Sequence, residues 1–270
     1  MELNTLFDLE PHGPDTFVGI GPRYPWGGLF GGQIVAQALR AAATTVDPAQ
    51  QVHSLRAYFI RRGDHTEPIR FEVDRIRNGR SFSTRRVVAR QAIGAILNLE
   101  ASFHAEEVTA DIETVAISGV VPGPEELTSD AWSTSFDRRD VPRGVLPADE
   151  RTGAGRNAAW MRVTAPIGDN QLLHRCWMAY MSDDMPADSV RNAHPEFAGT
   201  DGLTYVASLD HTIWFHRPLR ADEWHLYDVT CHTFVGARGL SIGHVFALDG
   251  THVATIAQEV LVRDARQKPD

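Results

Sequence analysis

Apolar residues recur at helical spacing between residues 31 and 46, directly after a glycine-rich stretch. Ile34, Val35, Ala38, Leu39 and Ala42 would share one face of a helix with 3.6 residues per turn. The residues that follow change to strand-like segments, separated by turn signals at Gly63, Asn78-Gly79 and Gly94. The segments are 53–63, 68–79, 80–91 and 94–105. The pattern predicts one helix followed by an antiparallel meander.

The same pattern starts again in the second half of the chain. Residues 157–166 have the composition of a strand, and residues 170–184 that of a helix. The apolar stripe of this helix is Leu173, Cys176, Trp177, Tyr180 and Met181. Beyond it, residues 208–229 align with 54–73, and residues 237–260 align with 78–103, with strands and turns in step. We interpret the chain as a diverged tandem duplication of one helix-plus-meander unit.

Between the two repeats, the sequence becomes acidic and rich in Pro, Gly, Ser and Thr, without lasting periodicity. We therefore predict an N-terminal half over residues 1–107 and a linker over 108–155. A C-terminal half would cover 156–265, and residues 266–270 would form a tail.

Composition narrows the classes of function. The chain has 270 residues and a net charge of −9, so binding to nucleic acid or to an anionic membrane would work against its overall field. No apolar run approaches the roughly 20 residues of a membrane span, and the start lacks the pattern of a signal peptide. Cys176 and Cys231 have no metal-like spacing, so we predict reduced thiols and no bound metal. Without a signal peptide or membrane span, we expect a cytoplasmic protein.

Residues 205–218, YVASLDHTIWFHRP, contain a serine, an aspartate and two histidines, the residue types of a hydrolytic triad. Side chains alternate along a strand, so His211 would point away from Ser208. His216 would share the face of Ser208 but lie roughly 26 Å away, at ~3.3 Å per residue. The G-x-S-x-G turn of α/β-hydrolases is also absent around Ser208. A triad within this stretch is therefore excluded, and the two histidines are best interpreted as satisfied residues at the edge of the core.

Several long segments carry a resemblance to a known family. They are RYPWGGLFGGQIVAQAL, VHSLRAYFIRRGD, RNGRSFSTRRV, DHTIWFHRP followed by DEW, and VATIAQEVLVR. The chain resembles the acyl-CoA thioesterase II (TesB-like) family, and the resemblance covers most of the sequence outside the linker. It implies an α+β fold, the tandem (double) hotdog, with two helix-plus-antiparallel-meander halves. It also implies hydrolysis of acyl-CoA to a carboxylic acid and coenzyme A by an activated water molecule, without a cofactor.

The family's catalytic trio maps onto three motifs of this chain. YMSD, ASLDH and AQEV supply Asp183, Ser208 and Gln258, with Ser208 in place of the family's usual Thr. Because Gln258 aligns with Ala101 of the first half, only the second half keeps all three groups. Asp184 stays the alternative base, since a continued helix would turn it more squarely onto the apolar stripe.

Other features leave alternatives open. The run GGLFGG offers backbone N–H groups for an oxyanion, with Gly32 as the candidate, and lacks the Gly-Lys-Ser/Thr sequence of a phosphate loop. Arg80, Arg85 and Arg86 would contact the phosphates of coenzyme A or lie on a solvated strand face.

Two alternative functions stay open, a hotdog hydratase or dehydratase and a non-catalytic acyl-CoA binding protein. Hotdog sheets have exposed edge strands, so the resemblance implies a homodimer or higher homo-oligomer. We expect no nucleic-acid partner and no stable membrane insertion.

Overall fold

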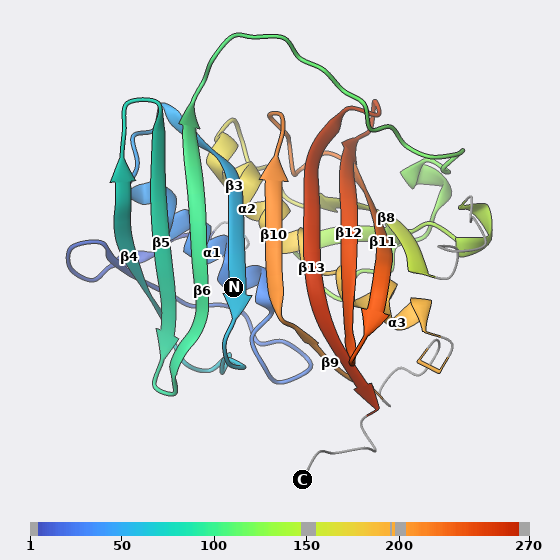
Figure 1. Ribbon diagram of the computed structural model, residues 1–270, viewed down its shortest axis with the longest axis horizontal. Coiled ribbons are helices and arrows are strands. Elements are labelled where there is room, and N and C mark those ends of the chain that lie inside the picture. Colours follow the sequence, from blue (N-terminus) through green and yellow to red (C-terminus); the bar gives the residue numbers. More distant parts are fainter. Residues whose placement is uncertain (1–4, 147–154, 195, 198–203, 265–270) are drawn as a thin grey trace. The chain divides into compact units, whose positions relative to one another are not determined.

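The computed structural model describes residues 5–146, 155–194, 196–197 and 204–264, so the predicted tail lies outside the described residues. The chain divides into two compact units, and each is built from separate stretches of sequence. The first unit contains residues 1–112, 167–181 and 212–220, and the second contains 113–166, 182–211 and 221–270. Helices and antiparallel strands make up both units, which makes the fold α+β (Figure 1).

The first unit contains the predicted helix and meander. Helix α1 spans Gly31–Thr44, and it packs against the strands of an antiparallel sheet. The strand order in this part of the sheet is β1-β2-β4-β5-β6-β3. Figure 1 shows the neighbours β4, β5, β6 and β3. The strands are β1 (Glu10–Pro11), β2 (Thr16–Gly19), β3 (Gln50–Phe59), β4 (Ile69–Asn78), β5 (Phe82–Gln91) and β6 (Gly94–Ala105). The predicted helix and the four predicted strand segments are confirmed, with ends that differ by a few residues.

Two helices approach each other closely within the first unit. Helix α2 spans Gln171–Ser182, and its residues up to Met181 belong to this unit. A Cβ atom at Gly32 would collide with the carbonyl oxygen of Tyr180, so only glycine allows this approach of α1 to α2. The Tyr180 ring packs edge-on against Phe30, and its hydroxyl lies 3.3 Å from that of Tyr24.

Arg85 has a structural role that the sequence did not indicate. It is almost fully buried, and its guanidinium donates to the backbone carbonyl and the hydroxyl of Thr45, the residue that caps α1. Further acceptors are Asn78 Oδ1 and the carbonyl oxygens of Arg77 and Thr84. A cation is favourable at a helix C-terminus because the helix carries partial negative charge there. Arg85 therefore lies neither on a solvated face nor free to meet a phosphate.

Within the second unit the strand order is β13-β12-β11-β8-β7, and β9 pairs with β13. Figure 1 labels these strands except β7. Helix α3 (Pro186–Ala193), which the sequence pattern did not predict, packs against β8, β9, β11, β12 and β13. The strands are β7 (Phe136–Asp140), β8 (Arg156–Val163), β9 (Thr204–Ser208), β11 (His225–Val235), β12 (Arg238–Ala247) and β13 (His252–Asp264).

The segment between the repeats is packed rather than bare over its described part. It contains β7 and two short 3₁₀ helices, Pro124–Glu126 and Arg143–Val145. Its apolar residues pack into the hydrophobic core around Trp160 and Trp224. The acidic and Pro-rich composition of the segment gave no sign of this packing. They are Val115, Ile117, Val121, Leu127, Val141 and Leu146.

One strand breaks where the two repeats would otherwise match. In the first repeat β3 is continuous from Gln50 to Phe59, with a register shift between Val52 and Ser54. In the second repeat β9 ends at Ser208, and β10 (Asp210–Phe215) begins after Leu209. The alternation of side chains is therefore interrupted at Leu209.

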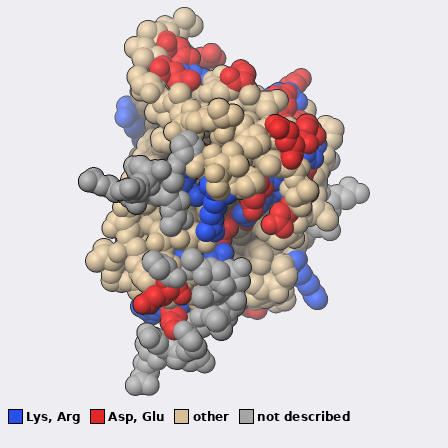
Figure 2. Space-filling view, turned by 90° about the vertical axis from the view of Figure 1, so that its right-hand side faces the viewer, with Lys and Arg blue, Asp and Glu red and all other residues tan. Residues whose placement is uncertain are grey.

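Charged side chains of both signs are interspersed on the face that Figure 2 shows. Many arginines of the described chain lie in ion pairs, such as Arg75 with Asp15 and Arg238 with Glu259. Each such pair contributes no net charge.

Candidate active site

Asp183 lies in the turn between two helices. It directly follows α2, which ends at Ser182, and α3 begins three residues later at Pro186. Its side chain is buried, with 7% of the residue's surface exposed. A carboxylate at this depth needs hydrogen-bond donors, because burial without them is costly.

Ser208 supplies one of these donors. It is the last residue of β9, opposite Val260 of β13, and its hydroxyl Oγ donates to Asp183 Oδ1 at 3.3 Å. The same oxygen accepts a hydrogen bond from Gln258 Nε2 at 2.7 Å. Gln258 lies within β13 and is fully buried. Folding therefore brings together Asp183, Ser208 and Gln258 from a helix end, a strand end and the middle of a strand.

His211 belongs to the same group of contacts, and the sequence-based argument missed it. Its Nδ1 lies 2.5 Å from Gln258 Oε1, and its Nε2 lies 2.8 Å from Ser182 Oγ. The expectation that His211 points away from the Ser208 site assumed one continuous strand. The break at Leu209 makes that assumption wrong, because it allows both Ser208 and His211 to reach Gln258. The expectation that His211 is a satisfied, buried residue is confirmed.

Burial sets the charge of this histidine. Full desolvation lowers the pKa of His211 from its ordinary value of 6.5 to about 4, although the bond to Gln258 and the charge of Asp210 act in the opposite direction. The ring is therefore neutral at neutral pH. It lies against two neutral side chains, Gln258 and Ser182.

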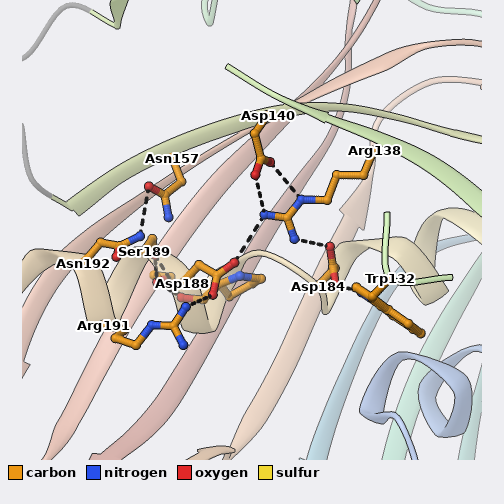
Figure 3. Close-up of polar contacts among 11 residues, drawn as sticks. Trp132, Arg138, Asp140, Asn157, Asp184, Asp188, Ser189, Arg191 and Asn192 are labelled. Carbon is orange, nitrogen blue, oxygen red and sulfur yellow. Dashed lines mark hydrogen bonds and ion pairs between the residues drawn. The ribbon is translucent and has the colours of Figure 1, made fainter. Parts of the chain in front are cut away.

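Asp184 faces a different set of partners (Figure 3). Its Oδ2 accepts from Arg138 Nη1 at 2.7 Å, and its Oδ1 accepts from Trp132 Nε1 at 2.5 Å. The guanidinium of Arg138 also contacts Asp140 and Asp188. These three carboxylates hold the pKa of Arg138 above its usual range, although burial of the guanidinium acts to lower it. Asp184 thus has both oxygens engaged by a buried ion network, whereas Asp183 contacts Ser208.

Gly32 lies in the first turn of α1, where backbone N–H groups have no partner within the helix. It belongs to the first unit, whereas Asp183, Ser208 and Gln258 belong to the second. Its close approach to Tyr180 gives it a packing role in addition to the predicted one.

Asp210 and His211 have separate partners, which bears on proton transfer at carbon. Asp210 Oδ1 accepts from the backbone N–H of Glu259 at 2.7 Å, while the His211 ring contacts Gln258 and Ser182. A hydratase would need these two groups to converge on one substrate carbon. The hydrogen bonds described here instead direct the two side chains to different groups.

Further observations concern metals, membranes and the two cysteines. Among the described residues, no group of three or more His, Cys, Asp and Glu side chains is arranged to hold a metal ion. The described helices are all too short or too polar to cross a membrane. Both cysteines are free thiols, and full burial raises the pKa of Cys176 to about 12.

Comparisons with known proteins cover both halves of the chain. Residues 21–104 match the family described as "Acyl-CoA thioesterase N-terminal domain", and residues 113–262 match "Acyl-CoA thioesterase C-terminal domain". The second match alone spans more than half of the chain. It contains Asp183, Ser208 and Gln258.

Individual relatives extend the similarity over nearly the whole sequence. The chain is 33% identical to human acyl-coenzyme A thioesterase 8, over 97% of this chain and 88% of that protein. It is 31% identical to acyl-CoA thioesterase 2 of Haemophilus influenzae, over 87% of each chain. A crystal structure of an acyl-CoA thioesterase II from Mycobacterium marinum superimposes with a TM-score of 0.87, at 36% identity and full coverage of both chains.

Proposed function

The chain belongs to the acyl-CoA thioesterase II family and has its α+β double hotdog fold, and from this premise we propose how it hydrolyses acyl-CoA. As a member of this family it is an acyl-CoA thioester hydrolase. In the proposed mechanism Asp183, Ser208 and Gln258 hold and activate a water molecule. This water attacks the thioester carbonyl, and the products are a carboxylic acid and coenzyme A.

The observation that carries the mechanism is the position of the Ser208 oxygen between an acid and an amide. Its hydrogen is directed at Asp183, and a lone pair is occupied by the N–H of Gln258. Engaging a lone pair in a hydrogen bond makes an oxygen a weaker nucleophile. No described contact joins Ser208 to a histidine, because the neighbouring ring of His211 bonds to the amide oxygen of Gln258. The bond from Gln258 supports a serine that orients water, whereas the bond to Asp183 suits either role, so trapping of an acyl-enzyme decides between them.

Each group has one task in the proposed reaction. Asp183 accepts a proton from the water as it attacks, which is general base catalysis. Ser208 and Gln258 can donate and accept hydrogen bonds, so they fix the direction of the water's lone pair without adding charge. The protonated Asp183 then supplies the proton that the leaving thiolate needs.

Negative charge develops on the thioester carbonyl oxygen, and backbone N–H groups commonly stabilise it. We assign this task to the first turn of α1, with the N–H of Gly32 as the donor. Support comes from its position at a helix N-terminus, where partial positive charge favours an anion.

Release of free thiol, measured on a panel of short, medium and long acyl-CoAs, tests the proposed function. The same assay shows which acyl-chain length the enzyme prefers. The proposal expects turnover of at least one member without added metal or cofactor. A non-catalytic acyl-CoA binding protein would bind the panel and release no thiol. That outcome would contradict the proposed function.

Further parts of the proposal concern organisation. We propose two hotdog halves, 1–107 and 156–265, with the catalytic groups in the second half. Assembly into a homodimer or higher homo-oligomer and a cytoplasmic location complete the proposal. Light scattering over a wide concentration range tests the assembly, and a monomer throughout would contradict it. Cell fractionation tests the location.

A further inference from the structure

The side-chain amide of Gln258 has two ends with opposite properties, and its contribution depends on which end faces Ser208. An amide nitrogen donates hydrogen bonds and an amide oxygen only accepts them. With the nitrogen towards Ser208, as observed, the serine hydroxyl is left to donate to Asp183. If the amide were turned by half a rotation, Ser208 would donate to Gln258 and its bond to Asp183 would be lost.

We propose that His211 is a positioning residue that locks the amide of Gln258 in its working orientation, and that Ser182 fixes the imidazole ring in turn. This inference deepens the proposed function, and it rests on that function for the roles of Ser208 and Gln258. His211 itself contacts neither the substrate nor the water in this scheme. It acts through Gln258.

Donor and acceptor rules fix the direction of each bond. Gln258 Oε1 can only accept, so His211 Nδ1, 2.5 Å away, carries a proton. The buried ring is neutral at neutral pH and therefore has one N–H. Its Nε2 is then without a proton, and the Ser182 hydroxyl, 2.8 Å away, donates to it.

The result is a one-way chain from Ser182 through His211, Gln258 and Ser208 to Asp183. Each group donates to the next, and the chain ends on a carboxylate, which only accepts. A turned amide would require the other His211 tautomer, and Ser208 would then donate away from Asp183. The negative charge of Asp183 therefore selects one direction for the whole chain.

Burial makes the lock effective. His211 and Gln258 are fully buried, and Ser182 is 1% exposed. A group that lost its partner here would have no bulk water to replace it, which is far more costly than at a surface. The neighbouring Asp210 side chain accepts a hydrogen bond from the backbone N–H of Glu259, and the two ring nitrogens of His211 lie against Gln258 and Ser182.

A pair of substitutions at one position separates the lock from mere packing. His211→Leu removes the donor to Gln258, and we expect kcat to fall by about 10-fold to 10²-fold, the scale of misplaced catalytic groups, with KM nearly unchanged. His211→Asn keeps an N–H at the branch where Nδ1 stands, so kcat should return to within about fivefold of wild type. His225→Leu is the matched control, because His225 is also buried in the second unit but bonds to a backbone carbonyl. It should leave kcat unchanged.

The tautomer gives a readout that does not depend on activity. The ¹⁵N chemical shifts of His211 should show a protonated Nδ1 and a bare Nε2 at neutral pH. A ring protonated at Nε2, or a charged ring, would overturn the proposal, and so would wild-type kcat in His211→Leu. If wild type cleaves no acyl-CoA, the proposed function fails while the tautomer still decides the lock. If His211→Leu does not fold, Ser182→Ala is tested in its place. We expect a several-fold loss of kcat in this variant. An unchanged kcat would contradict the proposed chain of hydrogen bonds.

Discussion

Asp183, Ser208 and Gln258 illustrate what single residues reveal before folding. Taken alone, each has an ordinary structural interpretation: a helix end, a small residue in a strand, and a polar residue in a strand. Their joint match to a family motif selected them, and the structure places their side chains in one hydrogen-bonded group. His211 escaped this reasoning because its contact with Gln258 depends on a strand break that alternation does not anticipate. Their catalytic roles remain predictions.

The two neighbouring aspartates should respond differently to the same change. Asp183→Asn removes the proton acceptor, and we expect turnover to fall by about 10²-fold or more. Asp184→Asn should leave the chemistry largely intact and lower stability, because Asp184 bonds to Arg138 and Trp132. Thiol release and thermal unfolding, measured on both variants, check this. An inactive Asp184→Asn beside a nearly wild-type Asp183→Asn would show that the base is misassigned.

Ser208 and Gln258 should behave as one unit. Ser208→Ala and Gln258→Ala each remove a group that orients the same water, so the double variant should lose far less than the product of the single losses. Ser208→Thr keeps the hydroxyl on a β-branched side chain suited to a strand, and it should retain activity. A double-mutant cycle on kcat/KM measures the coupling. Multiplicative losses would indicate independent roles.

Among the elements, those with strong periodicity were predictable and those shaped by tertiary contacts were not. Helix α1 and strands β3 to β6 follow the apolar pattern closely. Strand β7 and helix α3 did not appear in the sequence pattern. Strand β7 is dominated by charged residues, Asp137, Arg138, Arg139 and Asp140, and becomes a strand by pairing with β8. Its Arg138 then contacts carboxylates that follow α2 and begin α3.

The ion network around Arg138 should contribute strongly to stability. Arg138→Met leaves the carboxylate of Asp184, whose side chain is 6% exposed, without its cation, and breaking a buried pair from one side typically costs about 3–5 kcal/mol. Arg75→Met is the control, because the Arg75–Asp15 pair is far more exposed and such pairs contribute about 1 kcal/mol or less. Denaturant unfolding compares the two. Equal losses would contradict the assignment.

For the whole molecule, the repeated helix-plus-meander pattern and the family resemblance together predicted an α+β double hotdog, which the structure and comparisons confirm. Composition misled in one place: the acidic segment between the repeats contributes apolar residues to the core of the second unit. Low periodicity hid this contribution because its residues pack singly, between turns, rather than along one face of an element.

Acid stability is a property of the whole molecule that His211 should influence. Because the folded pKa of His211 lies near 4 and its ordinary value is 6.5, the unfolded chain binds the proton first as the pH falls. The contribution of the neutral His211 to the free energy of unfolding is complete above about pH 6.5. It is lost as the pH falls towards 4, by at most about 3 kcal/mol. His211→Asn should flatten the dependence of unfolding free energy on pH across this window. An unchanged slope would contradict a neutral, buried His211.

The central claim is that water, and not Ser208, attacks the thioester. Mass spectrometry of wild-type enzyme, quenched during the first turnover of an acyl-CoA substrate, tests it most directly. Water activation predicts an unmodified Ser208 peptide and no burst of free thiol, because no covalent intermediate forms. An acylated peptide containing Ser208 that appears and decays at the rate of turnover would contradict the account.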